Sequence, residues 1–175
     1  VENFSILMNN KATELGLTST HFVTPHGLDN DEHYTTAYEL ALLTDYALKN
    51  KTFSNIVGTK SHTIQINNSY KTLSNTNELL GNFEGVYGVK TGFTQQAKYC
   101  LSASALRNNT HLIAVTLCAE TSPIRFKDAT NLLNYGFANY ESVKICGAND
   151  KVATVKFEKG EKENVDLVAK DDLSA

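Results

Sequence analysis

The sequence predicts an α+β fold in which helices pack against an antiparallel β-sheet, followed by the start of a β-rich domain. Apolar residues recur at helical spacing near the N-terminus and again after residue 122. Between these segments, two strands of alternating pattern meet at Asn108-Asn109, a pair suited to a hairpin turn. Short strand-like runs follow residue 141. The 175 residues, 41% of them hydrophobic, suffice for one buried core.

Composition excludes several classes of protein. A net charge of −3 without a basic stripe argues against a nucleic-acid binder. No apolar run approaches the roughly 18 to 20 residues that a transmembrane helix needs. Cys100, Cys118 and Cys146 are too few and too widely spaced for a disulfide scaffold or a C-x-x-C metal site. We expect small buried thiols, although Cys100 and Cys118 flank the hairpin turn and could pair.

The first predicted helix ends at Gly16, a good residue to follow a helix C-terminus. Its apolar positions follow the helical period: Val1, Phe4, Leu7, Met8, Ala12 and Leu15. No capping residue precedes Val1, so we expect this helix to begin upstream and the sequence to belong to a longer protein.

A second helix is predicted after a turn-rich stretch from Thr18 to His33. Thr36 followed by Glu39 makes a capping box, in which each side chain bonds to the other residue's backbone N–H. The apolar pattern then continues to about Asn50 through Leu40, Leu43, Ala47 and Leu48.

Five strands are predicted in the middle of the chain. Two are short and polar and lie within residues 61–77, where Asn67-Asn68 can turn. The other three run from Gly85 to Thr94, from Tyr99 to Leu106 and from His111 to Ala119.

A third helix is predicted from Pro123 to about Tyr140, although Gly136 falls inside its apolar pattern and leaves its end open. We place a domain boundary near residue 141, so that 1–140 is one domain and 141–175 begins another. In the second domain we expect a turn and two strands: Cys146 to Asp150, Val152 to Phe157, and Val165 to Val168. These strands are too short to bury a core of their own.

The tripeptide Lys90-Thr91-Gly92 is the sharpest local feature, because it lies on a predicted strand and follows Gly88. A cation, a hydroxyl and a glycine on a sheet edge suit a peptide that ends in carboxylate. Lysine supplies a positive electrostatic field, threonine donates a hydrogen bond, and glycine lets the peptide backbone pair with the edge of the sheet. The alternative is an exposed strand end with a tight turn, since short motifs recur by chance.

Further segments extend the pattern beyond this tripeptide. They are Leu15-Gly16-Leu17, Thr20-His21-Phe22, Pro25-His26-Gly27-Leu28-Asp29, Thr76-Asn77-Glu78-Leu79-Leu80, Tyr99 to Ala105 and Leu132-Leu133-Asn134-Tyr135-Gly136-Phe137. With Gly85 to Thr94, and in this order, they resemble the C-terminal part of the serine-type D-alanyl-D-alanine carboxypeptidases, the low-molecular-mass penicillin-binding proteins. Residues 141–175 resemble the start of that family's C-terminal β-rich domain.

The resemblance implies acyl transfer, in which a serine attacks the penultimate D-alanine of a peptidoglycan stem peptide and water later releases the acyl-enzyme. Lys90 would supply positive potential toward the substrate carboxylate, and Thr91 would hydrogen-bond it. Gly92 would leave room for the ligand backbone, and the backbone N–H of Phe93 would be one oxyanion-hole donor. Arg125 lies where the family often has an arginine near the substrate carboxylate.

The sequence departs from the family pattern at its other two motifs. The nucleophile of the family belongs to S-x-x-K, and S-x-N supplies a second serine. No serine here has a lysine three positions later or an asparagine two positions later. In the family both motifs lie upstream of the position equivalent to Val1. We therefore expect this chain alone neither to hydrolyse peptide nor to be acylated by penicillin.

Other polar residues receive plainer interpretations. The five histidines lack zinc-ligand spacing, and Asp29, Asp31 and Glu32 read as a solvated acidic loop rather than a calcium site. His26 reads as a turn residue and Arg107 as solvated. No metal or organic cofactor is implied.

Two rival interpretations remain open at this point. A serine β-lactamase relative shares the motifs, and a non-catalytic module could bind D-Ala-D-Ala termini or a protein partner. For the favoured interpretation, the implied partners are stem peptides that end in D-Ala-D-Ala, with β-lactams as inhibitors and no nucleic acid. The substrate implies export to the outer face of the cytoplasmic membrane, with membrane association only through parts not in this sequence.

Overall fold

The computed structural model describes residues 2–156, 158 and 163–175. The chain divides into two compact units. The first comprises the residues up to Arg107 together with His111–Asn139, and the second comprises Asn108–Thr110 with Tyr140–Ala175.

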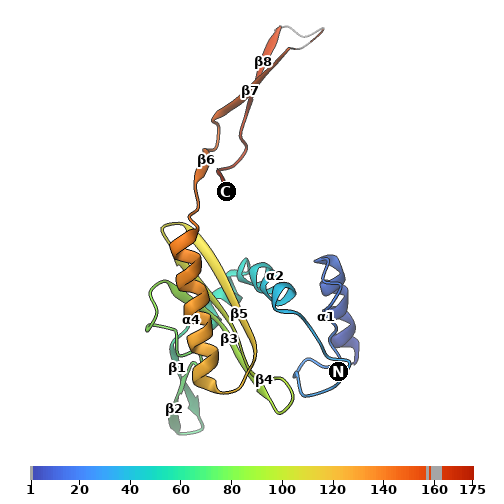
Figure 1. The fold of residues 1–175 in the computed structure, drawn as a ribbon, viewed down its shortest axis with the longest axis vertical. Coiled ribbons are helices and arrows are strands. Elements are labelled where there is room, and N and C mark those ends of the chain that lie inside the picture. The colour runs from blue at the N-terminus through green and yellow to red at the C-terminus, as the bar shows by residue number, and fades with distance from the viewer. Residues whose placement is uncertain (1, 157, 159–162) are drawn as a thin grey trace. The chain divides into compact units, whose positions relative to one another are not determined.

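Along the described residues of the first unit, three helices come first, five strands follow, and a fourth helix comes last (Figure 1). Its helices are α1 Glu2–Glu14, α2 Ala37–Leu48, α3 Lys51–Val57 and α4 Ser122–Asn139. Its strands are β1 Ser61–Ile66, β2 Ser69–Ser74, β3 Val86–Thr94, β4 Lys98–Arg107 and β5 Thr110–Ala119, of which Thr110 is counted with the second unit. The predicted α+β class is confirmed.

Two hairpins confirm the predicted turns. β1 and β2 pair antiparallel, with Ile66 opposite Ser69 around the turn at Asn67-Asn68. β4 and β5 are joined at Asn108 and Asn109, whose φ values of 46° and 65° give the left-handed backbone that tight hairpin turns require. The main sheet has the order β3-β4-β5, so β3 lies at its edge.

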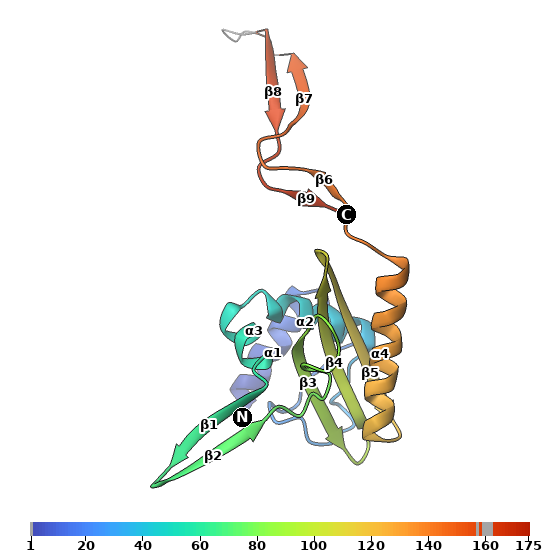
Figure 2. The same ribbon diagram turned by 90° about the vertical axis from the view of Figure 1, so that its left-hand side faces the viewer.

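One hydrophobic core lies between the main sheet and α4, which covers one face of that sheet (Figure 2). It contains Leu79, Leu101, Ala103, Ala105, Ala114, Phe126, Ala129 and Leu133. α4 continues through Gly136 to Asn139, and a Cβ at this position would lie 2.5 Å from Leu112 Cδ1. The glycine is therefore a packing requirement and does not end the helix.

The opposite face of the sheet carries α2 and α3 (Figure 2). Thr44 of α2 and Ser102 of β4 share a buried hydrogen bond, with 2.9 Å between their hydroxyl oxygens. A Cβ on Gly88 would lie 3.0 Å from Val57 Cγ2 of α3, so this glycine permits the close approach of α3 to β3. The short helix α3 was not predicted, although Asn50 is a favourable cap and accepts the N–H of Phe53.

The expected capping box at α2 is half correct. Thr36 Oγ1 accepts the N–H of Glu39 at 3.2 Å. The Glu39 carboxylate instead accepts the N–H of Ser19 at 2.8 Å and the hydroxyl of Thr20. The hydroxyl of Thr20 is the main cause that lowers the pKa of Glu39. Glu39 was expected to cap its own helix. It ties the helix to the 18–20 segment instead, because that segment offers its carboxylate two hydrogen-bond donors.

The predicted apolar stripe of α1 is largely exposed. Ala12 is buried, whereas Phe4 and Leu7 are 56% and 62% exposed. Val1 lies outside the described residues. The helix itself is confirmed, and it ends before Gly16, whose φ is +73°.

The expectation of buried thiols is wrong for Cys118, which is exposed, while Cys100 and Cys146 are half-buried. All three cysteines are free. Cys118 lies near the end of β5 with a φ of 58°, where the strand loses regular geometry and its side chain leaves the core. Cys100 instead donates its thiol to the carbonyl of Ala97.

The second unit is a thin β-structure of two paired ladders. β6 Lys144–Cys146 pairs with β9 Leu173–Ser174, and β7 Lys151–Lys156 pairs with β8 Asn164–Val168. Cys146 thus belongs to a strand and the turn follows it. Phe157, expected at the end of β7, lies outside the described residues. All described positions of β7 and β8 are exposed, which agrees with strands too short to enclose a core.

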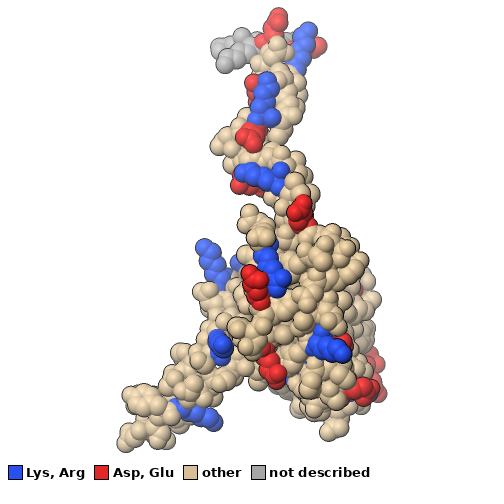
Figure 3. Space-filling model, turned by 60° about the vertical axis from the view of Figure 1, so that its left-hand side comes forward, with Lys and Arg blue, Asp and Glu red and all other residues tan. Residues whose placement is uncertain are grey.

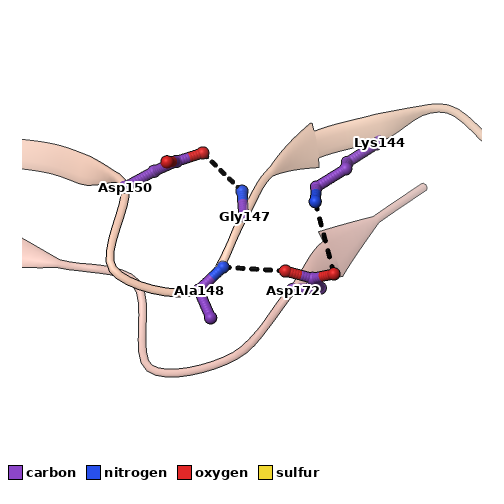
Figure 4. A network of polar contacts seen from close by, with 5 residues as sticks. All are labelled: Lys144, Gly147, Ala148, Asp150 and Asp172. Carbon is purple, nitrogen blue, oxygen red and sulfur yellow. Dashed lines mark hydrogen bonds and ion pairs between the residues drawn. The ribbon is translucent and has the colours of Figure 1, made fainter.

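Polar contacts hold the turn of the second unit (Figure 4). The Asp172 carboxylate accepts the N–H of Ala148 at 2.8 Å and pairs with Lys144 Nζ at 3.3 Å. The Asp150 carboxylate accepts the N–H of Gly147 at 2.6 Å. These bonds replace, in part, the apolar contacts that this unit lacks.

Charged residues of both signs are interspersed over the face of each unit that Figure 3 shows. No helix among the described residues has the length and apolar character needed to cross a bilayer.

Candidate functional site

The Lys90-Thr91-Gly92 motif lies on β3, the edge strand of the main sheet. In the register with β4, Lys90 is opposite Ser102, Thr91 opposite Leu101 and Gly92 opposite Cys100. Because β4 occupies only one side of β3, the backbone groups on its other side have no strand partner within the described sheet. This edge can therefore accept an extended peptide as an added strand.

The side chains of the motif alternate between the two faces of the strand. Thr91 is buried, whereas Lys90 and Gly92 are exposed. Phe93 is 54% exposed, and its ring lies 4.5 Å from that of Tyr99 across the hairpin. Gly92 has no side chain that would hold a ligand away, so the backbone of the ligand can approach the strand edge at this position.

Lys90 is the available positive charge of the site. Its Nζ donates to the carbonyl of Thr91, and it has no carboxylate within ion-pair distance in the part of the chain that is described. An unpaired ammonium beside an open strand edge attracts an anionic ligand.

Arg125 reaches the motif from the first turn of α4. It is only 8% exposed. Its Nη1 donates to the carbonyls of Gly92 at 3.0 Å and Cys100 at 3.3 Å, and its Nη2 donates to Ser122 Oγ at 3.1 Å. Its Nε is buried without a hydrogen-bond partner among the described residues. The guanidinium thus braces the β3–β4 hairpin at Gly92 and brings a second positive charge to it.

Two residues without a predicted role contact β3 directly. Thr76 Oγ1 lies 2.6 Å from Thr91 Oγ1, and Asn77 Nδ2 donates to the carbonyl of Gly88 at 2.9 Å. Asn77 is 2% exposed. The polar run from Asn75 to Asn77 was visible in the sequence, but nothing local indicated that it would lie against the motif strand.

A serine and a histidine also meet in the sheet, away from the motif. His111 Nε2 lies 2.7 Å from both Ser104 Oγ and Tyr87 Oη. Burial is the main cause that lowers the pKa of His111. Ser104 is completely buried, so no substrate can reach its hydroxyl. This serine–histidine pair is structural.

No group of three or more histidine, cysteine, aspartate or glutamate side chains is placed to hold a metal ion in the described residues. His26 takes part in its own turn, where Nδ1 accepts the N–H of Leu28 at 3.2 Å. The site therefore consists of an open strand edge, two cations and a threonine hydroxyl, which together suit a peptide carboxylate.

Comparison with known proteins identifies the class to which such an edge-strand site belongs. The family model described as D-alanyl-D-alanine carboxypeptidase matches residues 1–121, and that of the penicillin-binding protein 5 C-terminal domain matches residues 140–175. The chain belongs to the D-alanyl-D-alanine carboxypeptidase family, and the predicted family is thereby confirmed.

Individual relatives agree with this assignment. The chain is 39% identical over 174 residues to D-alanyl-D-alanine carboxypeptidase DacF of Bacillus subtilis, covering 99% of the chain and 45% of the relative. It is 40% identical over 144 residues to a D-alanyl-D-alanine carboxypeptidase of Streptomyces sp. strain K15, covering 79% and 50%. The chain spans about half the length of the curated relatives it matches.

Solved structures give the same fold. Penicillin binding protein 5 from Haemophilus influenzae matches with a TM-score of 0.85 at 34% identity, covering all of this chain and 51% of that one. The Streptomyces K15 DD-transpeptidase matches with a TM-score of 0.70 at 41% identity, covering 75% and 52%.

Proposed function

We propose that this chain is the C-terminal portion of a serine-type D-Ala-D-Ala carboxypeptidase, an exported enzyme of the cell envelope that removes the terminal D-alanine from peptidoglycan stem peptides. In this proposal residues 1–140 form the C-terminal part of the catalytic domain, and residues 141–175 begin the β-rich domain. The observation that carries the proposal is the Lys90-Thr91-Gly92 motif on an open edge strand, whose lysine pairs with no carboxylate among the described residues.

Each motif residue then has a physical role. Lys90 and Arg125 supply positive potential toward the terminal carboxylate, and the hydroxyl of Thr91 donates a hydrogen bond to it. Gly92 lets the substrate backbone pair with β3, and the backbone N–H of Phe93 donates to the oxyanion. Removing one oxyanion donor typically raises the activation free energy by about 3 kcal/mol.

The nucleophile would come from the S-x-x-K motif that the family carries and this sequence lacks. Its serine oxygen bonds to the carbonyl carbon of the penultimate D-alanine, and the peptide nitrogen leaves with a proton as free D-alanine. Water then adds to the same carbon, releases the shortened peptide and returns a proton to the serine. β-Lactams would inhibit by acylating the same serine.

Intact mass spectrometry after exposure to benzylpenicillin tests the proposal. The full-length product of the gene that encodes this sequence should carry one covalent adduct and should release D-alanine from a peptide ending in D-Ala-D-Ala. Residues 1–175 alone should do neither. Absence of both activities in the full-length product would overturn the proposed function, and an adduct on residues 1–175 would overturn the assignment of the nucleophile to another segment.

The absence of S-x-x-K from this sequence favours one alternative, a non-catalytic module that binds D-Ala-D-Ala termini or a protein partner. Titration of a D-Ala-D-Ala peptide into residues 1–175 distinguishes this binding module from the proposed portion of an enzyme. Saturable binding that requires Lys90 would support the module, whereas no binding agrees with a site that needs residues from elsewhere.

A further inference from the structure

We propose that Thr76 is a positioning residue that orients the hydroxyl of Thr91 toward the substrate carboxylate. The inference rests on the proposed function and adds to it a residue that favours substrates with a carboxylate. Thr76 lies outside the motif and on a different segment, yet its Oγ1 is 2.6 Å from Thr91 Oγ1. Thr91 makes no other side-chain hydrogen bond within the described residues.

A bound carboxylate fixes the direction of the hydrogen bond between Thr76 and Thr91. A threonine hydroxyl has one proton to donate and two lone pairs that accept. If Thr91 donated to Thr76, it would have no proton left for a carboxylate, which only accepts. A bound carboxylate therefore requires Thr76 to donate to Thr91, so that the Thr91 proton points to the ligand. In this direction the two hydroxyls polarise one another, which strengthens the bond to the anion.

The segment that carries Thr76 is fixed on both sides. Asn75 Nδ2 donates to the carbonyls of Val57 and Thr59, both at 3.1 Å. Asn75 Oδ1 accepts the N–H of Asn77 at 2.9 Å, and the buried Asn77 holds the carbonyl of Gly88. Thr76 is thus held between two anchored residues, so its hydroxyl is placed before any ligand arrives.

The exposure of the pair suits this role. Thr91 is 7% exposed, which limits competition from water for its hydroxyl, while Thr76 is exposed. When Thr76 donates to this shielded hydroxyl, the Thr91 proton is left to point toward the ligand. Such preorganisation stabilises a bound anion more than a freely rotating hydroxyl does.

The chain offers a matched control. Thr63 and Thr72 form a second threonine pair, with 2.8 Å between their hydroxyl oxygens, on the exposed β1–β2 hairpin. This pair has the same chemistry but does not touch the motif strand. Thr63→Val therefore removes an equivalent hydrogen bond at no functional position.

The test uses the full-length gene product and two reagents that differ only in the carboxylate. Acylation rate constants are measured by intact mass for benzylpenicillin and for its neutral methyl ester. Thr76→Val should lower the rate with benzylpenicillin about fivefold, as expected for loss of the one neutral hydrogen bond that orients Thr91. It should change the rate with the ester less than about twofold, since the ester has no charged oxygen to select the direction of the Thr91 proton. Thr76→Ser should restore the rate with benzylpenicillin, and Thr63→Val should change the rate with neither reagent.

The outcomes separate this inference from the function on which it rests. Equal losses with both reagents would mean that Thr76 only supports the fold, and would overturn the inference. An unchanged or higher rate with benzylpenicillin in Thr76→Val would overturn it as well. If the unsubstituted protein is acylated by neither reagent and releases no D-alanine, the proposed function itself fails and the inference falls with it.

Discussion

Strand β4 of the first unit and strand β7 of the second unit are both paired antiparallel, but their environments differ. On β4, Leu101 is 1% exposed and Ala103 is fully buried, because α4 covers that face of the sheet. On β7, Val152 is 56% exposed and no described position is buried. An alternating pattern therefore predicts a strand, whereas burial depends on a second layer that covers it.

The same contrast extends to what stabilises each unit. The first relies on close packing between the sheet and α4 and on buried polar anchors such as Asn77. The second relies on backbone pairing and on the carboxylates of Asp150 and Asp172 at its turn. Substitutions in the two units should therefore differ strongly in their cost.

The largest effect is expected from Leu133→Ala in the core beneath the sheet. Leu133 is 1% exposed, so the substitution leaves a cavity, and we expect a loss of about 2 to 5 kcal/mol in the free energy of unfolding. Urea denaturation followed by near-ultraviolet circular dichroism measures it. A loss below about 1 kcal/mol would show that the core collapses around the gap and that the first unit depends less on packing.

A smaller but still substantial loss is expected from Asn77→Ala. The substitution leaves the carbonyl of Gly88 and the N–H of Leu79 without their buried partner, which costs about 1 to 3 kcal/mol. Asn68→Ala, in the exposed β1–β2 turn, is the control and should stay within about 0.5 kcal/mol. Similar losses from both would remove the distinction between buried anchors and surface amides.

Acid should weaken the first unit through Glu39. Its pKa is lowered in the folded protein, chiefly by the hydroxyl of Thr20. The stability it contributes is therefore complete above the ordinary glutamate pKa of about 4.3 and is lost as the pH falls through the lower folded value. Melting temperatures between pH 6 and pH 3 should show a flatter acid limb for Glu39→Gln. The exposed Glu32→Gln should keep the original profile, and a Glu39→Gln profile identical to it would contradict the assignment.

The smallest effect is expected from Val155→Ala on β7. Val155 is 38% exposed, and we expect a change within about 0.5 kcal/mol. Amide hydrogen exchange along β7 and β8 reports it directly. A cost comparable to that of Leu133→Ala would mean that the second unit has a packed interior after all, and the comparison between the units would fail.

The sequence alone determined most of the regular elements and the family. Helical spacing located α1, α2 and α4, and the asparagine pairs located both hairpin turns, because these signals depend only on neighbouring residues. The motif at Lys90 with its flanking segments identified the carboxypeptidase family, which the comparisons confirm.

Only the tertiary structure decided which side chains meet. Glu39 turns to Thr20 instead of completing its capping box, and Arg125 packs beneath Gly92 although 33 residues separate them. Thr76 reaches Thr91 across 15 residues. Local periodicity carries no information about such pairs, because they depend on how α4, the 75–77 segment and the sheet pack together.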